Sequence, residues 1–344
     1  MTAKVSVKSN VLDGLDPTAP LLEVDNLQVE FHTRDGVAKA VNGASFSVER
    51  SETLAVVGES GCGKSVTSQA IMGILESPPA KVAGGRVLFH GVDLLTLPKD
   101  TRRRTRANHV AMVFQDALSA LNPVWTVGFQ LSELFRQHRG MSKKDAMKRS
   151  LELLDLVKIP AAAQRIKEYP HQFSGGMRQR VMIAMALALD PDLLIADEPT
   201  TALDVTVQAQ IMRLLKEIQV ERQMGLILIT HDLGVVADVA DKISVMYAGR
   251  IVEQAEVHEI FARPAHPYTK ALLKSIPRLD TKGQRLEIIK GLPPVLTNIP
   301  PGCAFAPRCT YVQDICRSQV PPLTVVASGR ASACHFASEV INDV

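Results

Sequence analysis

Residues 58–65 read Gly-Glu-Ser-Gly-Cys-Gly-Lys-Ser and directly follow the continuously apolar stretch 53–57. A buried strand, a glycine-rich turn and then a helix, here predicted over 65–75, are typical of a phosphate-binding loop. Glycines allow several backbone N–H groups to turn toward one anion. Lys64 supplies positive charge, and Ser65 offers a hydroxyl to Mg²⁺. The alternative is a glycine-rich turn that binds nothing, which the order of the flanking elements disfavours.

Several other stretches share the apolar character of 53–57, and such runs are typical of strands buried on both faces of a parallel sheet. They are residues 193–196, 226–229 and 243–246. Two earlier stretches, 21–31 and 41–48, instead alternate polar and apolar residues. Alternation predicts antiparallel strands with one solvent-exposed face. Helices are expected at 65–75, 143–157, 177–189 and 205–223, and helix-type periodicity is most frequent across about 76–172.

These patterns predict an α/β fold of several parts: a mixed, largely parallel core sheet, an antiparallel β subdomain, an α-helical subdomain at about 100–180 and a small irregular C-terminal extension. Residues 1–20 form a tail, 21–275 the main domain and 276–344 the extension. Seven prolines lie between Gly291 and Pro322. Because proline interrupts helices, the extension needs another means of holding its shape.

Composition excludes several classes of protein. The 344 residues carry 39 Lys and Arg against 36 Asp and Glu, a net charge of 39 − 36 = +3, whereas dedicated nucleic-acid-binding domains are strongly basic. Aromatic residues make up only 4%, which disfavours a base-stacking surface. No apolar run approaches the roughly 20 residues of a membrane span, and no signal-peptide pattern begins the chain. A reducing cytosol is therefore expected, and five cysteines do not make a disulfide scaffold.

A pair of carboxylates ends the apolar stretch 193–196. Asp197 fits the acidic residue that holds Mg²⁺ opposite the loop hydroxyl. Glu198 is placed to polarise a water molecule for in-line attack on the terminal phosphate. Taken alone, such a pair is more often a helix cap. The upstream loop favours the catalytic interpretation.

Four more motifs appear in a fixed order around these two. Residues 173–180 read FSGGMRQR, Gln115 lies in Val-Phe-Gln-Asp, residues 201–204 read Thr-Ala-Leu-Asp, and His231 directly follows the apolar stretch 226–230. Together with the loop and the acidic pair, they resemble the ATP-binding cassette (ABC) ATPases. The resemblance implies an ATPase with ATP and Mg²⁺, and a second ATPase subunit, since each motif occurs once and one chain supplies half of each composite site.

The resemblance also implies roles for particular residues. Glu198, His231 and Gln115 would be catalytic, and Ser65, Gln115 and Asp197 would hold Mg²⁺. Phe31, or alternatively His32, would stack on adenine. The remaining nucleotide contacts would come from Gly58, Ser60, Gly61, Cys62, Gly63, Lys64, Ser65 and Val66 of the chain's own loop, and from Ser174, Gly175, Gly176 and Asp204 across a dimer.

Further motifs narrow the resemblance to one branch of the family. Residues 121–123 read Leu-Asn-Pro, 169–177 read YPHQFSGGM, 199–206 read PTTALDVT and 266–269 read His-Pro-Tyr-Thr. These are similar to the dipeptide and oligopeptide importers, and they imply a peripheral subunit at the cytoplasmic face of the bacterial inner membrane. The implied partners are a second ATPase (a paralogue), two transmembrane permeases and an extracytoplasmic substrate-binding protein. Nickel and glutathione importers share the branch, so either cargo remains an alternative.

Four cysteines lie close together in the proline-rich extension: Cys303, Cys309, Cys316 and Cys334. Clustered thiols in a cytosolic protein favour a metal over disulfides. Structural zinc usually shows close cysteine pairs, which are absent here, and thiolates also suit a [4Fe–4S] cluster. The pattern resembles the extension of one peptide-importer ATPase that carries such a cluster. Zinc and four ordinary buried thiols are the alternatives.

The sequence leaves two other functions open. One is an ABC ATPase that acts on nucleic acid with a zinc module, which the modest charge and few aromatic residues disfavour. The other is a regulatory subunit that binds ATP without turnover, which Glu198 disfavours.

Overall fold

The computed structural model describes residues 15–116, 120–201, 203–275 and 289–343, and these form two compact units. We call the first the helical unit; it comprises the described parts of 1–21, 49–51 and 89–226. We call the second the strand-rich unit; it comprises 22–48, 52–88 and the described parts of 227–344. No helix of the described residues is long and apolar enough to cross a lipid bilayer.

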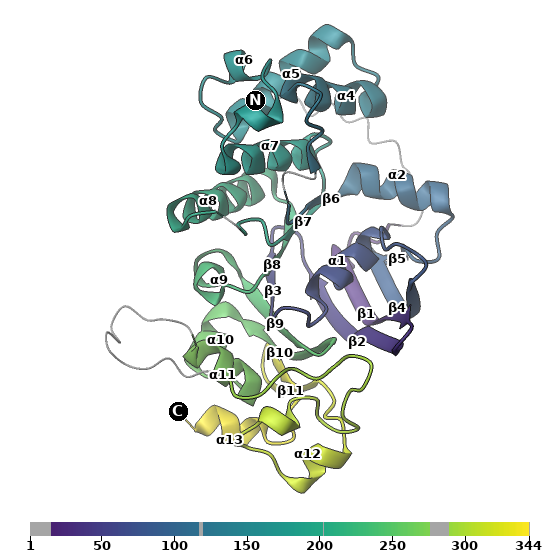
Figure 1. The fold of residues 1–344 in the computed structure, drawn as a ribbon, viewed down its shortest axis with the longest axis vertical. Coiled ribbons are helices and arrows are strands. Elements are labelled where there is room, and N and C mark those ends of the chain that lie inside the picture. Colours follow the sequence, from purple (N-terminus) through teal and green to yellow (C-terminus); the bar gives the residue numbers. More distant parts are fainter. Residues whose placement is uncertain (1–14, 117–119, 202, 276–288, 344) are drawn as a thin grey trace. The chain divides into compact units, whose positions relative to one another are not determined.

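An antiparallel sheet forms the first part of the strand-rich unit (Figure 1). β1 (Leu22–Thr33) pairs with β2 (Gly36–Val48), and β4 (Ala80–Phe89) lies on the other side of β1. Buried and more exposed residues alternate along much of β1 and β2, because one face covers the core while the other meets solvent. The alternation predicted β1 and β2, and the structure confirms both strands.

The second sheet of this unit is mixed. Its strand order is β11-β12-β10-β9-β3-β8. β3 (Thr53–Val57) pairs in parallel with β9 (Lys242–Tyr247), whereas β10 (Arg250–Glu256) returns antiparallel to β9. Every residue of β3 and of β8 (Gly225–Thr230) is buried, as the continuous apolar runs predicted. The predicted mixed core sheet is confirmed.

Helices of the strand-rich unit connect and cover these strands. The longer ones are α1 (Lys64–Met72), α9 (Leu233–Val239) and α11 (Pro267–Lys274). The shorter ones are α10 (Val257–Ala262), the 3₁₀ helix η2 (Ala306–Arg308), α12 (Asp314–Ser318) and α13 (Ala337–Asn342). A core of buried side chains, including Tyr247, Tyr268 and Phe305, joins the second sheet to the C-terminal segment. This aromatic packing, with ring centroids 4.6 to 5.4 Å apart, fixes the C-terminal segment to the strands.

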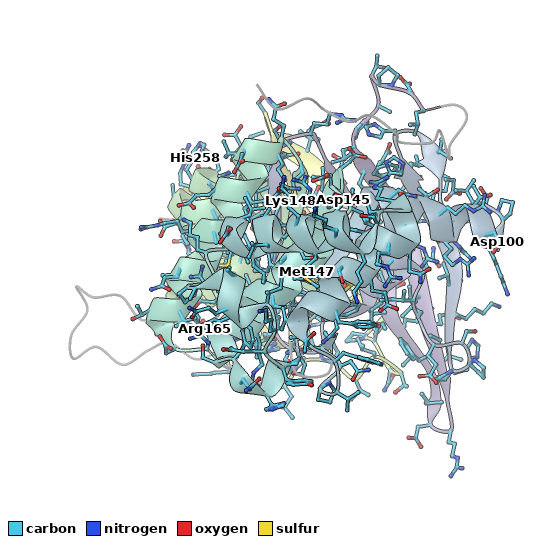
Figure 2. All side chains as sticks on the ribbon, turned by 90° about the horizontal axis from the view of Figure 1, so that it is seen from above. Asp100, Asp145, Met147, Lys148, Arg165 and His258 are labelled. Carbon is cyan, nitrogen blue, oxygen red and sulfur yellow. The ribbon has the colours of Figure 1, made fainter. Side chains whose placement is uncertain are left out.

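The helical unit contains most of the long helices. In chain order its elements are β5 (Val92–Asp93), α2 (Lys99–His109), β6 (Val110–Val113), α4 (Val127–Arg139), α5 (Lys143–Leu156), α6 (Ala162–Arg165), η1 (Pro170–Gln172), α7 (Gly175–Leu187), β7 (Leu193–Asp197) and α8 (Val205–Arg222). β6 and β7 are parallel. Helices α4, α5 and α7 pack on one another (Figure 1). On α5, Asp145 and Lys148 are exposed, while Ala146 is buried (Figure 2).

The structure adds to the expectations in two places. Helix-type periodicity was expected to be most frequent across 76–172, and β4, β5 and β6 also lie within this span. Residues 81–83 and 85–86 of β4 are exposed, so no regular alternation marks this strand. The C-terminal extension is also less irregular than expected. Its strands β11 (Thr324–Ala327) and β12 (Arg330–Ser332) extend the second sheet, β12 pairing antiparallel with β10.

His266 is a buried histidine at the start of α11. Its side chain is buried, Nδ1 accepts a hydrogen bond from Tyr268 N at 3.1 Å, and the ring also bonds the backbone of Ala333. Burial lowers the pKa of His266 from 6.5 to about 3. A proton on Nδ1 would place one donor against another, so the folded protein holds this imidazole neutral.

As the pH falls from 6.5 toward 3, His266 is protonated only in the unfolded chain, and this lowers the free energy of unfolding. Glu253 accepts a hydrogen bond from His266 N at 3.0 Å, and burial raises its pKa to about 7, so its protonation in the folded protein acts in the opposite direction. The contribution of His266 is therefore measured against His266→Asn, which keeps the N-cap acceptor: by pH 5 the unmodified protein should lose about 2 kcal/mol relative to this variant. Urea unfolding followed by circular dichroism at pH 7.5, 6.5 and 5.0 measures the difference. His258→Asn, at an exposed site (Figure 2), should follow the profile of the unmodified protein. Equal pH profiles for all three proteins would contradict the assignment.

Candidate nucleotide site and cysteine lobe

The loop 58–65 connects β3 to α1 in the strand-rich unit, as predicted. Gly63 has φ +109°, and a Cβ there would lie 2.3 Å from Ala40 O. At Gly58 a Cβ would lie 2.2 Å from Met246 O. Only glycine therefore fits at either position, since a backbone oxygen that close allows no side chain. At these two glycines the loop lies directly against the backbone of β2 and β9.

Lys64 lies within this turn. Its side chain is buried, and Nζ donates to Gly58 O at 2.8 Å and to Glu59 O at 3.0 Å. Helix α1 begins at Lys64, so its first backbone N–H groups and its positive dipole end also face the loop. Ser65 and Val66 are half-buried in the first turn of α1, and Ser60 is exposed. Burial raises the pKa of Cys62, which remains a thiol packed inside the loop.

Glu59 is held by two residues from distant parts of the chain. Tyr268 Oη accepts a hydrogen bond from Glu59 N at 2.9 Å. Arg308 forms a bidentate ion pair with the Glu59 carboxylate, Nη1 to Oε2 at 2.7 Å and Nη2 to Oε1 at 2.9 Å. Sequence analysis missed both partners, since more than 200 residues separate them from the loop.

A second group of candidate residues lies in the helical unit. Asp197 is buried at the end of β7, and Glu198 follows it with φ +45°, an uncommon conformation for a residue with a side chain. Gln115 Nε2 donates to Glu198 Oε2 at 2.9 Å, and Thr201 Oγ1 donates to the same oxygen at 2.9 Å. The structure thus brings together Gln115 and Glu198, two residues that the sequence placed 83 positions apart. Thr201, the first residue of the motif 201–204, is a further partner of Glu198, a role that the sequence did not indicate.

The glycine-rich segment 174–176 begins α7 in the same unit. Ser174 caps this helix, because its side chain accepts a hydrogen bond from Met177 N at 3.3 Å. A Cβ at Gly176 would lie 2.6 Å from Val207 Cγ1, and one at Gly175 would lie 3.4 Å from Leu203 Cδ2. The two glycines therefore pack directly on the chain that leads into α8. Asp204 caps α8, accepting from Val207 N at 3.0 Å, a structural role that sequence analysis did not assign.

The other predicted residues lie in the strand-rich unit. His231 is exposed directly after β8. Phe31 is half-buried in β1 opposite Ala38. The neighbouring His32 is exposed, with Nε2 3.7 Å from a carboxylate oxygen of Glu30.

The four cysteines of the extension line one small cavity, together with His266, Phe305, Tyr311 and Phe336. We call the segment 303–336 the cysteine lobe. All its cysteines are free thiols. Burial raises the pKa of Cys309 to about 11 and of Cys334 to about 12. No group of three His, Cys, Asp or Glu side chains placed to hold a single metal ion occurs among the described residues.

Backbone N–H groups are directed at several of these sulfur atoms. Tyr311 N donates to Cys309 Sγ at 3.3 Å, and Phe336 N donates to Cys334 Sγ at 3.4 Å. Cys303 likewise bonds the backbone of Phe305. Each donor lies two residues beyond its cysteine, so the lobe repeats one local turn that presents a sulfur atom to the cavity.

Comparison with known proteins identifies the family of the chain. The family model for the ABC transporter matches residues 41–201, and that for the oligopeptide/dipeptide transporter C-terminal region matches residues 252–316. The chain is 54% identical over 314 residues to the dipeptide transport ATP-binding protein DppD of Bacillus subtilis, covering 91% of this chain and 94% of the relative. It is 49% identical over 330 residues to the oligopeptide transport ATP-binding protein OppD of Salmonella typhimurium, covering 96% and 98%.

A solved structure shows the same fold. The ATP-binding cassette MJ0796, determined as a dimer in a post-hydrolysis state bound to ADP and Pi, superposes with a TM-score of 0.62 at 27% identity. The match covers 69% of this chain and 98% of that one. The chain belongs to the ATP-binding subunits of the ABC transporter family, within the oligopeptide/dipeptide transporter branch.

Proposed function

We propose that this chain is the ATP-hydrolysing subunit of an importer that carries dipeptides or oligopeptides across the bacterial inner membrane. The observation that carries this proposal is the hydrogen bond of 2.9 Å between Gln115 and Glu198, in a chain that also has the complete loop 58–65. Relatives named for dipeptide and oligopeptide transport support the cargo class. Nickel, glutathione or another small solute is the alternative cargo.

The nucleotide is proposed to bind as MgATP. Backbone N–H groups of the loop and Lys64 would contact the phosphates, with side-chain or backbone contacts from Gly58, Ser60, Gly61, Cys62, Gly63, Ser65 and Val66. Ser65, Gln115 and Asp197 are the residues that would hold Mg²⁺, whose charge would balance the β- and γ-phosphates. Phe31 would stack on adenine.

Hydrolysis would proceed by in-line attack of water on the γ-phosphorus. Glu198 would accept a proton from that water while the bond from the γ-phosphorus to the bridging oxygen breaks, giving ADP and phosphate. Gln115 and Thr201 donate to one oxygen of Glu198 and so fix the carboxylate. His231 would contact the γ-phosphate.

A second ATPase subunit would complete each site. We propose that Ser174, Gly175 and Gly176 at the start of α7 bind the γ-phosphate held by the partner's loop, as other helix N-termini bind anions. Asp204 would lie at the dimer contact. The remaining partners would be two transmembrane permeases, which would hold this subunit at the cytoplasmic face of the inner membrane, and an extracytoplasmic substrate-binding protein.

Reconstitution tests this function. The chain, co-expressed with its permeases and sibling ATPase and placed in lipid vesicles, should accumulate a labelled peptide only when ATP and Mg²⁺ are present. Uptake of a nickel or glutathione label in place of peptide would favour the alternative cargo. Salt-sensitive DNA binding without permease association would contradict transport altogether.

For the extension, 276–344, which follows the proposed ATPase domain 21–275 in the chain, we propose a [4Fe–4S] cluster held by Cys303, Cys309, Cys316 and Cys334. Four free thiols around one cavity, with backbone N–H groups directed at three of them, fit such a cluster. In an iron–sulfur cluster the cysteine thiolates lie further apart than the ligands of a single metal ion, because sulfide bridges separate the iron atoms. Cysteines placed to hold a single ion are therefore not required. When bound, the cluster would link four segments of the lobe.

We expect the protein purified without oxygen to contain iron and acid-labile sulfide in equal amounts and to show a broad absorption band in the visible region. Cys334→Ser should remove most of both, whereas Cys62→Ser, outside the lobe, should remove neither. Elemental analysis and absorption spectra measure this. Zinc in place of iron, or no metal in either the unmodified protein or Cys62→Ser, would contradict the cluster.

A further inference from the structure

The loop 58–65 contains one acidic residue, Glu59, beside its one basic residue, Lys64. A loop built to receive a triphosphate gains from positive charge, and an uncompensated carboxylate at its second position would repel the ligand. The Glu59 side chain is 24% exposed, so solvent screens its charge only in part. Some other group must offset this charge if the loop is to bind phosphate well.

Arg308 supplies that offset from the cysteine lobe. Its side chain is only 4% exposed and meets both carboxylate oxygens of Glu59. The other contacts of the guanidinium are Lys290 O at 3.2 Å, Ile289 O at 3.4 Å and Tyr247 Oη at 3.3 Å. All five N–H donors of the arginine thus have an acceptor. Because all its donors are hydrogen-bonded, the side chain is fixed in one position, unlike that of an ordinary surface arginine.

Aromatic packing adds to this placement. The Arg308 guanidinium lies 5.8 Å from the centre of the Tyr247 ring and 5.9 Å from that of Phe305. The pairing with Glu59 raises the pKa of Arg308 further above its usual range, so the charge is permanent. Arg308 ends η2 and directly precedes Cys309. The anchor of the loop and one wall of the cysteine cavity therefore belong to the same short turn.

The loop backbone is anchored at the same residue. Tyr268 is fully buried in α11, and its hydroxyl accepts the N–H of Glu59. This hydrogen bond engages the Glu59 N–H within the protein. Both the backbone and the side chain of Glu59 are thus held by the C-terminal region, through Tyr268 and Arg308.

We infer that Arg308 is a positioning residue for the nucleotide site: by pairing with Glu59, it holds the loop in shape and neutralises the one carboxylate that would oppose the triphosphate. The inference rests on the proposed binding of MgATP by residues 58–65. It gives the cysteine lobe a direct influence on nucleotide binding that a separate accessory domain would not have.

Equilibrium binding of a fluorescent ATP analogue with Mg²⁺ to the full-length chain tests this role. Arg308→Met should raise the Kd about tenfold, because Glu59 then faces the phosphates without a partner. Glu59→Gln alone should bind at least as tightly as the unmodified chain. In the double variant the carboxylate is absent as well, so the Kd should return to within about twofold of that of Glu59→Gln. Arg317→Met, at an exposed arginine beside Cys316, should change nothing.

Each outcome has a distinct meaning. Recovery in the double variant supports electrostatic positioning, because a merely structural defect in the lobe would persist when Glu59 is changed. Unchanged binding by Arg308→Met, or a double variant as weak as Arg308→Met, would overturn the inference while leaving the nucleotide site intact. Failure of the unmodified chain to bind MgATP would instead overturn the proposed function, and this inference with it.

Discussion

Replacing Glu198 by Gln is expected to lower the rate of ATP hydrolysis by the assembled transporter by about 10²- to 10⁴-fold, the usual contribution of a general base. Gln has nearly the same shape and can still accept hydrogen bonds from Gln115 and Thr201. It cannot accept the proton of the attacking water at neutral pH. Nucleotide binding should therefore survive, and the loss should fall on kcat rather than on KM.

Steady-state phosphate release by the complex in lipid vesicles measures this effect. Glu221→Gln, at an exposed position in α8, is the matched control and should hydrolyse ATP at the normal rate. Turnover by Glu198→Gln within a factor of two of normal would rule out general-base catalysis by this carboxylate.

The second large effect is expected at Gly63. A methyl group there would meet Ala40 O at 2.3 Å, and the residue has φ +109°. Gly63→Ala should therefore cost about 3 kcal/mol of folding free energy or more and should abolish nucleotide binding. Gly61 lies in the same loop at φ +78°, but a Cβ there would meet nothing within 4 Å. Gly61→Ala should cost only about 1 to 2 kcal/mol from its left-handed backbone.

Urea unfolding and titration with the fluorescent ATP analogue compare the two variants. Equal losses of stability and of nucleotide binding in both variants would mean that backbone conformation alone explains the need for glycine. A folded Gly63→Ala protein that binds MgATP normally would show that the loop geometry described above is not required.

Local patterns predicted most of the fold. Strand β3 was expected at 53–57 and lies there, and α5 begins at the expected Lys143. The reason is that burial on one face leaves a period in the sequence, whereas burial on both faces leaves a continuous apolar run. Strand β4 left no clear period, because residues 81–83 and 85–86 are exposed, and it lies within the span where helix-type periodicity was expected to be most frequent.

The candidate site was predictable where its residues are close in sequence. The turn at 58–65 needs glycines within a few positions, so its chemistry is visible in one short stretch. The ion pair between Glu59 and Arg308 has no such signal, because 249 residues separate the two. The hydrogen bond from Thr201 to Glu198 was not predicted for another reason. In the sequence, a hydroxyl that orients a carboxylate resembles any other polar residue in a turn.

The central claim is that two such subunits, this chain and a sibling or a second copy, enclose ATP between the loop of one and the start of α7 of the other. A structure of the complete transporter with Glu198→Gln and MgATP tests it most directly. We predict a triphosphate in contact with Lys64 on one subunit and with residues 174–176, or their counterparts, on the other. A nucleotide-bound assembly in which residues 174–176 contact no triphosphate would contradict the account.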